Sequence, residues 1–278
     1  MSALPGFLAA RDIWAVPLGA SVLAGALLGF LGVYVVLRRI VFVSAALTQI
    51  STLGLVATLL AEEWLHVEAE HAGEQIAVAM AFSVAGALAL AWFRPGRLPA
   101  EATVGASWVI ASSGVVLGAS LLVHAAHDLG GMVFGNAVAV PAVDLWIIAG
   151  VTGLFAAVHT LFEKELRFSS FDPETARALG VNVRLWDAVL FAMIGLSIPA
   201  AARALGALPV FAFLTLPASA ALLLRLRLRA ALAAATAIGV AAAGGGYVAS
   251  WLLEVPTGAA MVAVAALFLL PGLVRKSA

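Results

Sequence analysis

Cysteine is absent from this 278-residue chain, which excludes disulfide bonds, thiolate metal ligands and cysteine nucleophiles. Lysine is almost absent too. Lys164 and Lys276 are the only two, and neither follows the glycine that a G-x-x-x-x-G-K-[S/T] phosphate-binding loop requires. The HExxH and GxSxG motifs and paired carboxylates in the middle of a helix are also missing. We therefore expect no catalytic site and no bound cofactor on this chain.

Charge is scarce and balanced, with 15 basic and 15 acidic residues and a formal net charge of zero. No bulk electrostatic field would attract nucleic acid. Apolar residues make up 64% of the chain, charged residues only 11%, and the mean hydropathy is +1.10. A soluble domain has about 45–50% apolar and about 25% charged residues. The excess of apolar surface requires a bilayer as solvent, so the chain is predicted to be an integral membrane protein.

Apolar stretches long enough to cross a bilayer recur along the whole sequence and leave no room for a soluble domain. We predict an all-α, polytopic bundle in a single membrane domain, 1–278, with about nine spanning helices; eight would also fit. The predicted spans are 13–37, 40–61, 76–93, 103–123, 143–162, 187–202, 207–224, 230–252 and 257–274. Within 187–224, we expect Pro199, Arg203, Pro209 and Pro217 to break the chain into short pieces, one of them a candidate re-entrant segment.

Basic residues occur in every second connection, and acidic residues and histidines occur in the others. The positive-inside rule then places the N-terminus outside and the C-terminus in the cytoplasm, with an odd number of crossings. Two small-xxx-small pairs, Gly25/Gly29 and Gly114/Gly118, predict close helix packing, as does the Ala- and Gly-rich stretch 230–246.

One cytoplasmic connection, 163–185, contains the start and stop signals of a two-turn helix. Asp172 suits the N-cap, Pro173 the first helical position, Glu174 the positive end of the helix dipole and Gly180 the stop. Two interpretations are equally compatible with these residues: an interfacial helix that lies on lipid, or a docking element for a cytoplasmic partner.

The segment Phe171-Asp172-Pro173-Glu174-x-Ala176-x-x-x-Gly180 resembles the cytoplasmic signature of the permease subunits of bacterial ABC importers for zinc and manganese. Four more segments resemble that family in the same order: Arg38-Arg39 with 42–54, Glu101 to Gly105, Phe134 to Val140, and Pro256 to Ala259. The resemblance implies a vitamin-B12-importer-like permease in the bacterial cytoplasmic membrane. It also implies a second copy of the chain, a cytoplasmic ATPase that binds ATP, and an extracytoplasmic metal-binding protein. The helix at 172–180 would then couple the chain to the ATPase.

The chain departs from that family at three positions where the family has ligand-grade side chains. Ala45 and Gln49 stand at its aspartate and histidine positions in the second helix, and Asn136 stands at the aspartate of its Phe-Gly-Asp segment. Zinc prefers imidazole or carboxylate ligands and manganese prefers carboxylate oxygens, so Gln49 and Asn136 offer weaker amide oxygens. Two hypotheses follow: zinc, manganese or iron moves by a looser, hydrated route, or the substrate is different.

Histidines and carboxylates gather in two predicted outer connections. His66 and His71 lie in an acidic loop. If the second segment is helical, His124 and His127 share a face, and Asp128 adds a carboxylate oxygen. These five side chains are candidate metal contacts at the entrance. The alternatives are a solvated acidic loop for the first group and an interfacial turn for the second. An ion-coupled secondary transporter is the rival function, although buried ionisable groups near mid-bilayer and inverted repeats are not evident.

Overall fold

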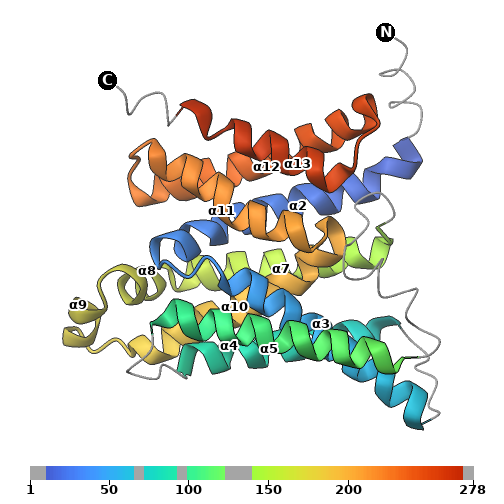
Figure 1. Ribbon diagram of the computed structural model, residues 1–278. Coiled ribbons are helices and arrows are strands. Elements are labelled where there is room, and N and C mark those ends of the chain that lie inside the picture. Colours follow the sequence, from blue (N-terminus) through green and yellow to red (C-terminus); the bar gives the residue numbers. More distant parts are fainter. Residues whose placement is uncertain (1–10, 66–71, 93–98, 123–139, 272–278) are drawn as a thin grey trace. The chain divides into compact units, whose positions relative to one another are not determined.

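The computed structural model describes residues 11–65, 72–92, 99–122 and 140–271. Within these ranges every regular element is a helix (Figure 1), which confirms the predicted all-α class. In the described part of the chain, seven helices are long and apolar enough to cross a membrane: α2 (Arg11–Leu37), α3 (Val43–Leu65), α4 (Ala72–Trp92), α5 (Ala100–Leu121), α7 (Ala142–Leu161), α10 (Val183–Leu205) and α12 (Leu228–Leu253). Two further apolar helices are shorter: α11 (Ala207–Leu223) and α13 (Thr257–Leu267).

Each of the nine predicted spans falls on one of these nine helices. The structure gives seven of them a spanning length, so a count of nine crossings and the sidedness derived from it stay predictions.

The prolines of the region 187–224 do not break it into short pieces, so that expectation was wrong. α10 continues through Pro199 to Leu205, and α11 continues through Pro217. The chain is interrupted only once here, at Gly206, where φ is +92°. A proline in a membrane helix is tolerated because neighbouring groups satisfy the freed carbonyl, whereas a positive φ favours glycine.

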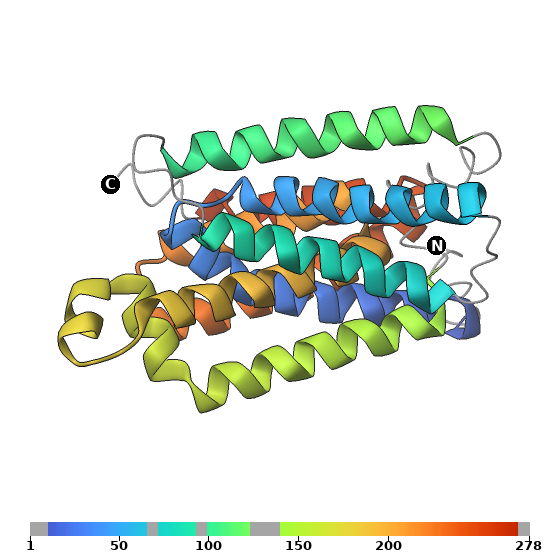
Figure 2. The same ribbon diagram turned by 90° about the horizontal axis from the view of Figure 1, so that it is seen from below.

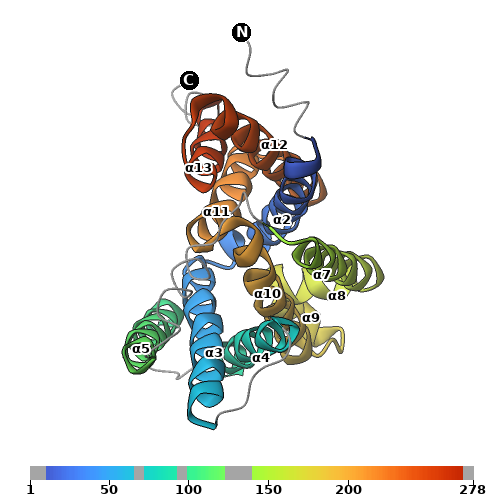
Figure 3. The same cartoon turned by 90° about the vertical axis from the view of Figure 1, so that its right-hand side faces the viewer.

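The structure divides into two compact units, and the first comprises 1–41, 134–152 and 200–278. In its described part, α2 packs along α11 and α12, and α13 packs against both α11 and α12 (Figure 3). A Cβ added to Gly25 would lie 2.6 Å from the carbonyl oxygen of Gly239, and one added to Gly29 would lie 2.5 Å from that of Ala235. The predicted close packing at Gly25 and Gly29 is therefore confirmed, and the Ala- and Gly-rich stretch of α12 is its partner.

The turn between α12 and α13 is held by hydroxyl groups. The Oγ of Ser250 donates to the carbonyl oxygen of Val255 at 2.6 Å and lies 2.8 Å from the Oγ1 of Thr257. A Cβ on Gly258 would lie 2.8 Å from Cγ of Pro209, so only glycine lets α13 begin so close to α11. These contacts make the turn depend on the hydroxyls of Ser250 and Thr257 and on the missing side chain of Gly258.

The second unit comprises 42–133 and 153–199. In its described part α3 is the central helix of three, with α4 on one side and α5 on the other (Figures 2 and 3). A Cβ on Gly114 would lie 3.0 Å from a methyl group of Leu53, and Gly118 lies similarly against Val56. Gly195 brings α10 against α4, since a Cβ there would lie 3.0 Å from the Cα of Val84. Small residues thus let the helices of this unit approach one another closely.

Candidate functional site

The connection between the spans α7 and α10 contains two short helices, α8 (Glu163–Phe171) and α9 (Pro173–Ala178). The sequence predicted α9, but it treated the residues of α8 as loop, which was wrong. α8 carries an i, i+4 ion pair in which Nη1 of Arg167 lies 3.0 Å from Oε1 of Glu163. Such pairs add only a few tenths of a kcal/mol, about 0.3–0.5, to an exposed helix, so apolar burial of Leu166 contributes more to its position.

The start of α9 has the capping geometry that its sequence predicted. The carboxylate Oδ1 of Asp172 accepts a hydrogen bond from the backbone N–H of Thr175 at 3.1 Å, and Pro173 occupies the first helical position. The N–H of Asp172 also bonds to the carbonyl of Phe168 and so closes α8. One residue therefore ends one helix and begins the next, which forces a sharp turn in the chain.

The end of α9 is a Schellman motif. The N–H of Val181 bonds to the carbonyl of Ala176 at 2.9 Å, and the N–H of Gly180 bonds to that of Arg177 at 3.0 Å. Gly180 has φ of +80°, the left-handed region, as its predicted stop position requires. Asn182 then caps α10, because its Oδ1 accepts from the N–H of Leu185 at 3.2 Å. Every turn in this segment is specified by a local hydrogen bond.

The turn also stabilises the ionised form of the Asp172 carboxylate. Hydrogen bonds from the hydroxyl and the backbone N–H of Thr175 hold the pKa of Asp172 below its ordinary value, since both stabilise the charged form. Asp172 is therefore ionised at neutral pH and adds a negative charge at the positive end of α9.

The outer surface of this segment combines apolar and charged side chains. Ala176 is fully buried, whereas Phe171 and Leu179 are 37% and 67% exposed. Glu174 and Arg177 are exposed beside them. An exposed apolar patch with charges of both signs, on a helix outside the spans, is suited to docking against another protein.

Within α3, the structure places Gln49 in a helix that carries several hydroxyl groups. Gln49 is half-buried, as is Ala45. Thr48 is buried, and its hydroxyl donates to the carbonyl of Ser44 at 2.8 Å, in the same helix. The proton of the Thr48 hydroxyl is therefore used within the helix, as is common for threonine in membrane helices.

Gln49 is the one predicted metal contact that lies within the described residues. Among the described residues, no three His, Cys, Asp or Glu side chains lie close enough to hold a metal ion. The other predicted contacts lie outside the described residues: His66, His71, His124, His127, Asp128 and Asn136. Their role stays a prediction.

A buried ion pair that sequence reasoning missed lies in the first unit. Nε of Arg203, at the end of α10, lies 2.9 Å from Oδ1 of Asp144, in the first turn of α7. The Asp144 side chain is 3% exposed and that of Arg203 is 30% exposed. The predicted topology could have indicated this pair, because it puts the start of the fifth span and the end of the sixth span on the same side of the membrane.

These features define the class of protein: a multi-pass membrane helix bundle that carries a capped, exposed helix between two of its spans. The sequence profile of the ABC 3 transport family matches residues 13–276, and the chain belongs to that family. It is therefore a transport permease subunit, a multi-pass protein of the bacterial cytoplasmic membrane. Membership implies that an ATPase and a substrate-binding protein are separate chains of the same transport system.

Curated relatives cover most of the chain. A manganese transport system membrane protein, MntC of Halalkalibacterium halodurans, is 30% identical over 252 residues, which cover 89% of this chain and 82% of that protein. An uncharacterized membrane protein of Synechocystis, slr2045, is 26% identical over 249 residues, 89% of this chain and 85% of that one.

Solved structures share the fold. PsaBC from Streptococcus pneumoniae in complex with Fab matches with a TM-score of 0.79 at 22% identity, covering 97% of this chain and 95% of that one. An inward-facing putative metal-chelate type ABC transporter matches with a TM-score of 0.71 at 15% identity, covering 94% and 85%. At these identities the likeness establishes the permease fold alone.

Proposed function

We propose that this chain is the membrane permease of an ATP-driven importer for a divalent transition metal, and that manganese is the first ion to test. The capped helix α9 carries the proposal, because a six-residue helix with its own N-cap and Schellman stop is built to hold one shape outside the membrane. In this proposal α9 lies on the cytoplasmic side and docks to the ATPase, with Phe171 and Leu179 as its apolar contacts.

The assignment of the substrate is supported by the relatives, because MntC of H. halodurans is named as a manganese transporter. The amide of Gln49 in α3, at the family's histidine position, argues for weak coordination along the path. An amide oxygen binds a dication less well than imidazole or carboxylate does, so the ion would keep more of its water. Two copies of the chain would form the path, and His66, His71, His124, His127, Asp128 and Asn136 would contribute contacts.

Uptake by the complete system tests the substrate. The permease, its ATPase and its binding protein are reconstituted in vesicles, and ATP-dependent uptake of manganese, zinc and iron is measured. We expect manganese uptake that requires all three proteins. Failure to accumulate any of the three metals would refute the metal assignment while leaving the permease fold intact. If no ATPase co-purifies with the permease, the coupling role of α9 is wrong, and an ion-coupled mechanism is favoured.

Two variants locate the path in the same assay. Gln49→His should lower the KM for the metal, since imidazole is the stronger ligand. Gln49→Asn, which keeps an amide at the same position, is the matched control and should change the KM little. Replacing His124 and His127 by alanine should weaken uptake if they collect the ion at the entrance, and unchanged uptake would remove them from the site.

A further inference from the structure

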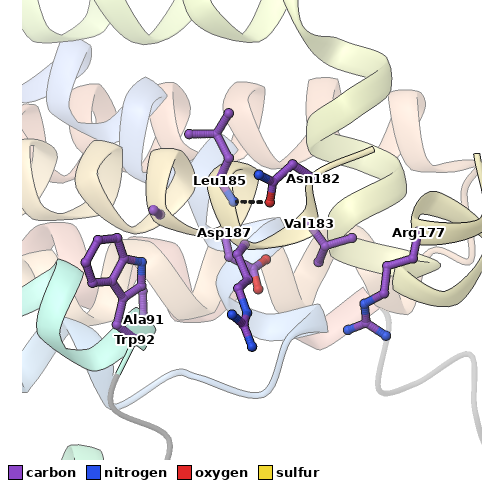
Figure 4. A pocket seen from close by; sticks show the side chains of 9 residues that line it. Ala91, Trp92, Arg177, Asn182, Val183, Leu185 and Asp187 are labelled. Carbon is purple, nitrogen blue, oxygen red and sulfur yellow. Dashed lines mark hydrogen bonds between the residues drawn. The ribbon is translucent and has the colours of Figure 1, made fainter. Parts of the chain in front are cut away.

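A cleft of about 780 Å³ lies in the second unit, beside α9. It is formed by the last residues of α4, by Arg177 of α9 and by the first turns of α10 (Figure 4). Its lining residues are Ala91, Trp92, Arg177, Asn182, Val183, Arg184, Leu185, Asp187 and Ala188. The metal proposal uses none of these residues. The docking surface of α9 shares only the exposed Arg177 with the cleft, because its apolar contacts are Phe171 and Leu179.

The cleft lies at the boundary between membrane and water. Trp92 is the last residue of one apolar span, and Val183 is the first residue of another. Trp92 is also 75% exposed. Tryptophan is enriched at the headgroup level of bilayers, because its ring is apolar and its N–H needs a polar partner. The opening therefore faces the lipid headgroups, whichever side of the membrane it lies on.

The charge of the lining favours an anion. The lining contains two guanidinium groups, Arg177 and Arg184, and one carboxylate, Asp187, so positive charge is in excess. Within the described part of the chain, neither guanidinium forms an ion pair. Arginine holds phosphate oxygens through its planar fork of N–H donors, and two such groups beside one anion share its charge.

Apart from Asn182, whose Oδ1 caps α10, the rest of the lining is apolar. Ala91, Val183, Leu185 and Ala188 supply aliphatic surface next to the indole of Trp92. Free inorganic phosphate has no apolar part that could contact this surface. The glycerol and upper acyl carbons of a phospholipid would cover it and remove it from water. We propose that this cleft binds one anionic phospholipid, with its headgroup phosphate between Arg177 and Arg184 and its glycerol region against Trp92.

The test titrates the complete permease–ATPase complex with lipid in detergent and follows bound lipid by native mass spectrometry. The probes are phosphatidylglycerol, phosphatidylcholine and inorganic phosphate. Each cation near an anionic headgroup contributes roughly a fivefold factor in affinity, so R177Q/R184Q should bind phosphatidylglycerol about 25-fold more weakly. Each single variant should lose about fivefold. R225Q/R227Q removes the same charge from two exposed arginines of another connection and should leave the affinity unchanged.

Three outcomes would overturn the proposal. Unchanged affinity for phosphatidylglycerol in R177Q/R184Q would exclude the cleft as the site. Displacement of the lipid by inorganic phosphate at equal concentration would identify the free anion as the ligand. Loss of ATPase binding with unchanged lipid binding would make the cleft a protein contact. In vesicles, the emission component that W92F removes should be quenched more by brominated phosphatidylglycerol than by brominated phosphatidylcholine, and equal quenching by the two lipids would contradict a site for the anionic lipid.

Discussion

The stop residue of α9 allows a sharp test of whether this helix must hold its shape. Gly180 has φ of +80°, and a Cβ added there would meet no atom within 4 Å. Gly180→Ala therefore introduces backbone strain without any steric clash. A left-handed conformation costs an L-residue roughly 1–2 kcal/mol, and asparagine pays less than alanine.

The effect on coupling follows from the size of α9. A six-residue helix is marginal without its caps, so a loss of about 1–2 kcal/mol lowers its folded population about 5- to 30-fold. Binding to the ATPase, measured by titration of the purified subunits, should weaken by up to that factor in Gly180→Ala and by less in Gly180→Asn. ATP-dependent uptake should decrease in the same order.

The matched control is Gly153→Ala in α7, where the added Cβ also meets no atom but φ is helical. This substitution should leave ATPase binding unchanged. Equal affinities for the unaltered chain, Gly180→Ala and Gly180→Asn would refute the reasoning, because α9 would then couple without a defined C-terminal stop.

Three further predictions concern stability and pH. Replacing Arg203 by alanine leaves the buried Asp144 carboxylate without its cation and should cost about 3 kcal/mol, the low end for buried pairs because Arg203 is partly exposed. The thermal midpoint in detergent should drop, and D144N/R203Q should recover most of it; no drop would mean that the pair is not formed. Gly239→Ala pushes a methyl group onto the carbonyl oxygen of Gly25 and should cost about 1–3 kcal/mol in the same assay. Gly245→Ala, which adds only an ordinary contact, should be neutral, and equal losses would refute the close packing. Because Asp172 has a lowered pKa, its cap is complete above the ordinary value of 3.8 and is lost as the pH falls through the lowered one. Hydrogen-exchange protection of the capped amide should fall in acid but not in D172N, and an identical acid profile would exclude the carboxylate cap.

Much of this structure follows from local patterns. The nine apolar stretches, the cap at Asp172 and the stop at Gly180 depend on residues within one or two turns of each other, and all of them appear as helices or turns in the structure. The prolines misled the prediction, because the cost of Pro199 or Pro217 in a helix depends on what satisfies the freed carbonyl nearby. No local pattern contains that information. The candidate metal contacts are a different case, since all of them except Gln49 lie outside the described residues.

By itself, the sequence determined the solvent of this protein and its helical class, because hydropathy and capping act over short stretches of chain. It also marked Gly25 and Gly29 as sites of close approach, but not the helix that approaches them. Only the tertiary structure decided that α12 is this partner and that Asp144 pairs with Arg203. The cleft of Trp92 and Arg177 likewise exists only once α4, α9 and α10 meet. These pairings join residues far apart in the chain, and their free energy depends on geometry that no local pattern specifies.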